Sequence, residues 1–125
     1  MVKSVISMII VAILLFCMAA FEADFVKRQF CEFDTVLEVL YEKVSDETAT
    51  EDDVYAVQKN WLDKKRYLHA FIPHNEIKEI DLWLAESVKL VREKEWTDAV
   101  SKIEVLKELS EQIPKTFSVT WENIF

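Results

Sequence analysis

The chain has 125 residues, no glycine, two prolines, two cysteines, 51% apolar residues and a formal net charge of −8. This length fits one domain, and the lack of glycine argues against a sheet, whose tight turns and bulges use it. It also excludes glycine-dependent phosphate loops and the G-x-S-x-G nucleophile elbow. The acidic charge, with no basic cluster longer than Lys64-Lys65-Arg66, argues against nucleic acid as a partner. We expect an acidic all-α protein.

Residues 5–21 form an apolar run that directs the chain to a membrane. As a helix the run reaches roughly 26 Å, which is at the short end for a spanning segment and long for the apolar core of a signal peptide. Its length therefore favours an uncleaved anchor over residues 1–21, in contact with the lipid bilayer through residues 5–21. Cleavage after Ala19, which would release a secreted protein, is the alternative.

The basic residues around this run give no clear orientation, because Lys3 precedes it and Lys27 and Arg28 follow it beside acidic residues. A short amino-terminal side followed by a long acidic domain is the usual form of a signal anchor. We therefore expect a single-pass protein of the cell membrane with a cytoplasmic N-terminus and an extracytoplasmic domain. Cys17 and Cys31 lie about 21 Å apart on one helix, too far for a disulfide.

Behind the anchor, apolar residues recur at helical spacing in four segments. Neither glycine nor proline interrupts residues 5–45, so the anchor should continue directly into the first helix of the domain. The expected inward positions are Val26, Phe30, Phe33, Leu37, Leu40 and Val44; Val54, Val57, Trp61, Leu68 and Phe71; Ile77, Ile80, Leu84, Val88 and Val91; and Ala99, Ile103, Leu106 and Ile113. Helices joined by short turns predict an up-down-up-down antiparallel four-helix bundle over residues 22–114.

Local signals predict where the helices begin and end. Thr50 and Asp53 predict a capping box at the start of the second helix, which should end at Ile72 because Pro73 follows. His74 or Asn75 should cap the third helix.

The fourth helix should run from about Trp96 to Pro114. The apolar tail that follows, residues 115–125, should dock on the bundle or at the membrane interface, a region that suits the aromatic residues Phe117, Trp121 and Phe125.

The sequence carries no pattern that predicts chemistry. His69 and His74 flank a helix break at a spacing that matches no known zinc site, and the pair Glu76 and Glu79 stands beside lysine, as on a solvated helix face. We therefore expect no catalytic, metal or cofactor site, and a module that acts by contact.

Two features indicate a surface for a protein partner. Trp83 falls beside, not on, the apolar seam of the third helix, and exposed tryptophans are frequent anchors of interfaces. Acidic residues gather between the first two helices, at the end of the bundle predicted to lie far from the membrane: Asp46, Glu47, Asp52 and Asp53. Acidic residues near the start of a helix also interact favourably with the helix dipole, and this explains their presence there equally well.

Two alternatives stay open at this point. A sensory domain that binds a small ligand between its helices would need a cavity of about 300 Å³ near Trp61, Trp83 and Trp96. A coiled-coil homodimer through the first helix is the other.

The order of several motifs resembles one family. The motifs are Trp61-Leu62-Asp63-Lys64-Lys65, Phe71-Ile72-Pro73-His74-Asn75-Glu76-Ile77, the turn from Trp96 to Ala99, Ile113-Pro114 and the ending Glu122-Asn123-Ile124. Together with the amino-terminal apolar segment they are similar to small bacterial membrane-anchored proteins of the domain of unknown function 4363. The resemblance implies an extracytoplasmic helical domain and brings no activity. Pro73 and Asn75 stand where acidic residues are commoner in that family.

Overall fold

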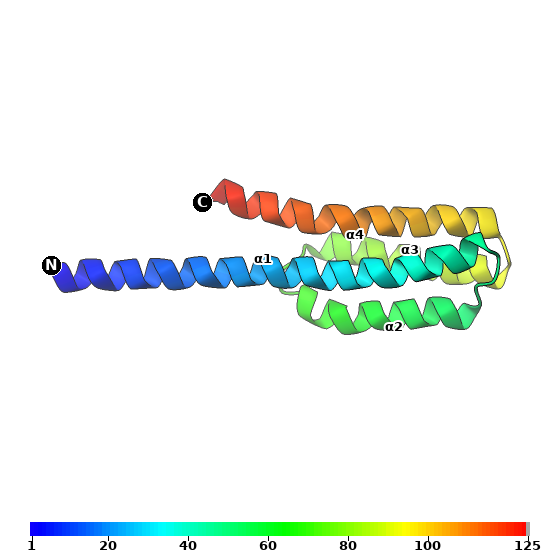
Figure 1. Ribbon diagram of the computed structural model, residues 1–125, viewed down its shortest axis with the longest axis horizontal. Coiled ribbons are helices and arrows are strands. Elements are labelled where there is room, and N and C mark those ends of the chain that lie inside the picture. Colours follow the sequence, from blue (N-terminus) through cyan, green and yellow to red (C-terminus); the bar gives the residue numbers. More distant parts are fainter. Residues whose placement is uncertain (125) are drawn as a thin grey trace.

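The computed structural model describes the backbone of residues 1–124 and the side chains of residues 1–116. Its elements are α1 (Val2–Ser45), α2 (Glu51–Leu68), α3 (His74–Arg92) and α4 (Trp96–Ile124). Each helix runs opposite to the one before it, and α4 returns to lie beside α1 (Figure 1). The contacts join α1 to α2, α2 to α3, α3 to α4 and α4 to α1, so the predicted up-down-up-down bundle is confirmed.

Helix α1 is 44 residues long and belongs to two environments. Its first half extends past the ends of α2 and α3, and α4 covers part of the same length (Figure 1). The apolar side chains of this half are mostly exposed, with Ala19 buried, whereas the second half of α1 supplies one wall of the core. Within the described part of the chain, α1 is the one helix that is long and apolar enough to cross a membrane. The expected continuity between the apolar segment and the first helix of the bundle is thus confirmed.

The core consists of the inward positions that the spacing predicts. All of them are buried except Phe71, which is half-buried against the core. Trp61, 1% exposed, is the largest, and its ring packs against Phe30 and Phe33 with centroid distances of 6.2 and 5.1 Å. Burying a large apolar side chain contributes about 1.5–3 kcal/mol, so this stripe is the main source of stability.

Ion pairs cross each of the four helix interfaces. They are Lys64–Glu32 (2.5 Å) between α2 and α1, Lys65–Asp81 (2.6 Å) between α2 and α3, Lys102–Glu86 (3.5 Å) between α4 and α3, and Lys107–Glu38 between α4 and α1. Most of these groups are partly exposed, and such pairs contribute about 0–1 kcal/mol each. They therefore help to set the register of the helices and add little to the stability of the bundle.

The helix ends confirm one prediction and correct two others. The capping box is present, because the Thr50 amide donates to Asp53 Oδ2 at 2.8 Å and the Asp53 amide donates to Thr50 Oγ1 at 3.4 Å. Helix α2, however, ends at Leu68 and not at Ile72. The Leu68 carbonyl accepts the Phe71 amide at 2.9 Å, a bond over three residues that is tighter than the α-helical one. The predicted caps of α3 are wrong as well: Pro73 is the N-cap, and no side chain caps the helix.

The predicted end of the fourth helix at Pro114 is also wrong, because α4 contains this proline and continues to Ile124. The proline removes one backbone hydrogen bond, and α4 packs against α1 over its length as a whole. The side chains of Phe117 and Trp121, and Phe125 as a whole, lie outside the described residues. Docking of the tail residues 115–125 therefore stays a prediction.

Two residues after the end of α1 and of α3, the backbone has positive φ, at Glu47 (59°) and Lys94 (57°). Helices commonly end on a left-handed residue, usually glycine, which this chain lacks. At both ends the following amide bonds back to the last turn, from Thr48 to the Lys43 carbonyl and from Glu95 to the Leu90 carbonyl, each at 2.9 Å.

Candidate functional site

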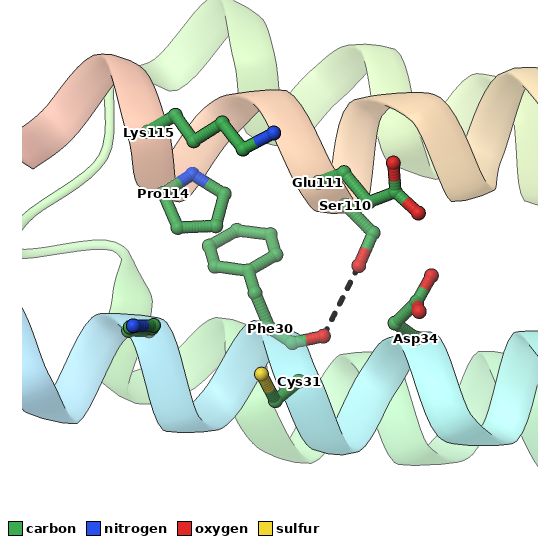
Figure 2. A pocket seen from close by; sticks show the side chains of 8 residues that line it. Phe30, Cys31, Asp34, Ser110, Glu111, Pro114 and Lys115 are labelled. Atoms are coloured by element: carbon green, nitrogen blue, oxygen red, sulfur yellow. Dashed lines mark hydrogen bonds between the residues drawn. The ribbon is translucent and has the colours of Figure 1, made fainter.

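A groove of about 320 Å³ lies between α1 and α4, in the half of the bundle nearer the apolar segment (Figure 2). Its walls come from side chains at helical spacing on the two facing helices: Lys27, Phe30, Cys31 and Asp34 of α1, and Ser110, Glu111, Pro114 and Lys115 of α4. The volume is within the range of small-molecule sites, which starts at about 300 Å³.

Ser110 fixes the floor of this groove. Its side chain is 2% exposed, and its hydroxyl donates a hydrogen bond of 3.1 Å to the Phe30 carbonyl on α1 (Figure 2). Pro114 lies four residues later on α4 and has no amide hydrogen to donate to the Ser110 carbonyl. The hydrogen bond from Ser110 to α1 therefore lies in the same turn of α4 that lacks the backbone hydrogen bond from residue 114 to residue 110.

Two carboxylates face one another across the groove, Asp34 from α1 and Glu111 from α4 (Figure 2). Asp34 Oδ1 is buried and has no hydrogen-bond partner among the described residues. Burial raises the pKa of Asp34, and the charge of Glu111 raises it further, while Lys107 acts in the opposite direction. Asp34 therefore offers a buried acceptor to a donor or cation that enters the groove.

The other groove residues decide what could bind. Phe30 and Pro114 give an apolar middle, and Lys27 and Lys115 add positive charge, with the Lys115 side chain extending toward Glu111 (Figure 2). A molecule with a cationic or hydrogen-bond-donating group at one end would complement the acidic end. The Ser110 hydroxyl is already engaged, because it donates its hydrogen bond to the Phe30 carbonyl.

The predicted acidic surface lies at the end of the bundle opposite the projecting segment, in the turn between α1 and α2 (Figure 1). Asp46, Glu47 and Asp52 are exposed there. Asp53 is engaged: its carboxylate accepts from the Thr50 amide and, at 3.0 Å, from the Lys43 ammonium, and these bonds lower its pKa. Three of the four predicted acidic residues are therefore open to a partner.

Trp83 does not join this acidic surface. It lies in the middle of α3, half-buried against the core, with Lys102 Nζ of α4 at 4.5 Å from its ring centre. Since α3 ends at Arg92, Trp83 lies about 14 Å from the acidic end of the bundle along the helix axis. The structure thus separates the two features that the sequence offered as one partner surface.

The three tryptophans proposed to surround a ligand are placed differently from each other. Trp61 is a core residue whose indole nitrogen donates to Asp81 at 2.7 Å, and Trp96 is half-buried at the start of α4. The groove beside Trp61 measures about 200 Å³, below the size of a usual ligand pocket. The groove between α1 and α4 is larger than the one beside Trp61 and contains a buried acceptor without a partner among the described residues, so it is the better candidate for a ligand.

The two histidines come together without forming a metal site. Their rings stack with centroids 5.5 Å apart across the turn between α2 and α3. Burial raises the pKa of nearby Glu76, and the charge of Glu79 adds to this effect. Among the side chains that the structure describes, no three histidine, cysteine or acidic residues converge as metal ligands would.

The sequence did not predict the groove. Two polar residues at inward-facing positions could have indicated contacts between helices. Ser110 continues the spacing of Ile103 and Leu106, and it bonds to α1. Lys64 lies between Trp61 and Leu68, is 7% exposed, and bonds to Gln29 and Glu32 of α1.

A family model described as Domain of unknown function (DUF4363) matches residues 28–124. The match covers most of the bundle, from residue 28 onward, and leaves out the apolar segment of α1. It includes every groove residue except Lys27. No curated protein and no solved structure matches the chain.

Proposed function

We propose that this chain, which belongs to the family described as Domain of unknown function (DUF4363), is a single-pass membrane protein that presents a non-enzymatic interaction or regulatory module outside the cytoplasm. Its mechanism is contact: the bundle is held at a membrane and offers surfaces to a partner.

The continuity of α1 is the observation that carries the proposal. One helix contains both the exposed apolar segment and the buried positions from Val26 to Val44. With neither glycine nor proline in it, α1 lacks two of the usual causes of a kink. The bundle would therefore stand on a stiff stalk, with a fixed orientation relative to the bilayer.

The contact surface that best fits this arrangement is the acidic turn between α1 and α2. Asp46, Glu47 and Asp52 are exposed there, at the end that an anchored bundle would hold farthest from the lipid. Their charge favours a partner with a basic surface, since complementary charge accelerates and selects encounters.

The first test measures the intact mass of the protein from carbonate-washed membranes and from the medium of the same culture. Recovery of the full 14.7 kDa chain in the membranes supports the anchor. Recovery from the medium of a product that begins after Ala19 would mean that the first segment is a cleaved signal, and the protein a secreted bundle.

The two cysteines provide a test of orientation. Cys31 is exposed on the bundle, whereas Cys17 lies within the apolar segment. A membrane-impermeant maleimide applied to intact cells should label the Cys17→Ala variant and leave the Cys31→Ala variant unlabelled. Labelling of Cys31 only after lysis would place the bundle in the cytoplasm and contradict the proposed orientation.

A second candidate function, sensing of a small ligand, is favoured by the groove between α1 and α4. The buried Asp34 Oδ1 lacks a partner among the described residues, and the groove is large enough for a small amine. Phenethylamine, a cation with an apolar ring, should then raise the melting temperature of the parent protein but not of Asp34→Asn. Equal effects on both proteins would remove this candidate.

A further inference from the structure

The end of the bundle nearest the apolar segment carries an aromatic cluster. Phe25 of α1 contacts Tyr67 of α2 and Phe71 of the following turn edge-on, with ring centroids 6.4 and 6.1 Å apart. Tyr67 is 62% exposed, and its hydroxyl has no hydrogen-bond partner among the described residues. We call Phe25, Tyr67 and Phe71 the proximal aromatic face.

The level of this face along α1 follows from the helix rise. The apolar run ends at Phe21, and Phe25 lies four residues later, about 6 Å along the axis. Each headgroup layer of a bilayer is about 5–8 Å thick, from the difference between the total and hydrocarbon thickness. If the apolar run spans the hydrocarbon, Phe25 and the two rings packed on it are level with the headgroups.

The register of α4 brings a lysine to the same level. The bond between Ser110 and the Phe30 carbonyl places these residues opposite one another, and the helices are antiparallel. Lys115, five residues after Ser110, is therefore level with about Phe25.

The distribution of charge agrees with this placement. Basic residues at this end are Lys27, Arg28, Arg66 and Lys115, and acidic ones are Glu22, Asp24 and Glu76, with Arg28 and Asp24 paired at 3.1 Å. The charge is nearly balanced here, whereas the turn between α1 and α2 is strongly acidic. Anionic lipids would repel that turn and accept this end of the bundle.

We propose that the proximal aromatic face rests in the headgroup layer of the bilayer that α1 enters, so that the bundle makes a second contact with lipid beside its anchor. Tyrosine with an apolar body and a free hydroxyl suits this layer. The inference rests on the proposed membrane anchor. The acidic turn then stands away from the lipid, about 32 Å farther along α1 at Asp46.

The test uses full-length protein without its native cysteines (Cys17→Ala, Cys31→Ala), reconstituted into vesicles of phosphatidylcholine and phosphatidylglycerol. A fraction of the lipid carries a nitroxide quencher on its headgroup. A fluorophore is attached at Ala70→Cys, an exposed residue of the turn after α2, or at Asp46→Cys in the distal turn. We expect loss of fluorescence at position 70 and none at position 46.

A matched pair of variants tests the role of the aromatic face. Tyr67→Asp should reduce the quenching at position 70. Tyr55→Asp should not, because Tyr55 lies on the same helix, is 44% exposed, and is about 18 Å farther from the membrane. Because both side chains are exposed, we expect both variants to keep the helical circular dichroism of the parent.

Flotation of the vesicles separates the two proposals. Protein that does not float with the vesicles contradicts the anchor itself. Protein that floats but is unquenched at position 70 overturns the headgroup contact alone. Quenching at both positions would mean that the bundle lies flat on the membrane. An unchanged signal in Tyr67→Asp would mean that the proximal aromatic face does not hold the bundle against the lipid. Either of these results also overturns the inference.

Discussion

Replacing Pro114 by alanine should stabilise the bundle, because the proline interrupts a helix that continues for ten further residues. Proline in a helix interior is less favourable than alanine by about 3 kcal/mol, since it removes one hydrogen bond and clashes with the preceding turn. The carbonyl that would regain its partner is that of Ser110, at the floor of the groove.

Two losses reduce this gain. Alanine makes the unfolded chain more flexible, which costs about 0.4–1 kcal/mol. The half-buried proline ring also contacts the groove, and the loss of roughly one buried methylene costs about 0.8 kcal/mol. The expected net gain is about 1–2 kcal/mol, or about 4–16 °C in melting temperature for a domain of this size.

The assay is chemical and thermal unfolding in detergent micelles, followed by circular dichroism. The chain offers its other proline as a control: Pro73 is the N-cap of α3 and interrupts no helix, so Pro73→Ala should lower stability by about 0.4–1 kcal/mol. If Pro114→Ala is no more stable than the parent while Pro73→Ala behaves as expected, packing against α1 requires the local geometry of the proline, and the reasoning fails.

Three further predictions use the same unfolding assay. Glu47→Gly and Lys94→Gly should each stabilise the protein by about 0.5–1 kcal/mol, because relief of the left-handed backbone exceeds the entropy cost of glycine; lower stability would refute this. Thr50→Ala should cost about 1 kcal/mol through loss of the cap, whereas Thr35→Ala, in the middle of α1, should change stability by less than about 0.5 kcal/mol. The raised pKa of Asp34 means that the folded state holds the proton of this carboxyl group more tightly than the unfolded chain does. The stabilisation that results is complete below the ordinary pKa of 3.8 and is lost as the pH rises through the raised pKa. Asp34→Asn should therefore gain stability relative to the parent as the pH rises to neutrality, and a constant difference at all pH values would contradict the assignment.

The helices and their buried faces were predictable because helical periodicity records burial directly. Phe30, Leu37 and Ile80 belong to series of apolar residues at intervals of three and four, a spacing that places each series on one face of its helix, and the bundle buries that face. The ends were less predictable, because a proline predicts a break only from local geometry. At Pro114 the helix continues in spite of that local cost, within a helix that packs against α1.

The candidate groove could not be predicted from the sequence, because it combines residues that are eighty positions apart, such as Phe30 and Ser110. The spacing places Ser110 on an inward face but does not say which carbonyl it meets. For Asp34, the sequence gives no sign that α4 would bury one of its oxygens and bring Glu111 close. These facts depend on the register of α1 against α4, which only the folded structure defines.

If the proposed anchor spans a bilayer, the heights of the surfaces above that bilayer follow from α1 and limit what each surface could bind. Cys31 lies about 15 Å beyond the end of the apolar run, above a headgroup layer of about 5–8 Å, so the groove would be open to molecules in solution, with Lys27 nearer the lipid. Glu47 lies about 39 Å beyond the same point. A partner of the acidic turn must therefore be soluble or extend that far from the membrane. A ligand in the groove, by contrast, would act on α1 and α4 close to the bilayer, where the stiff stalk enters it.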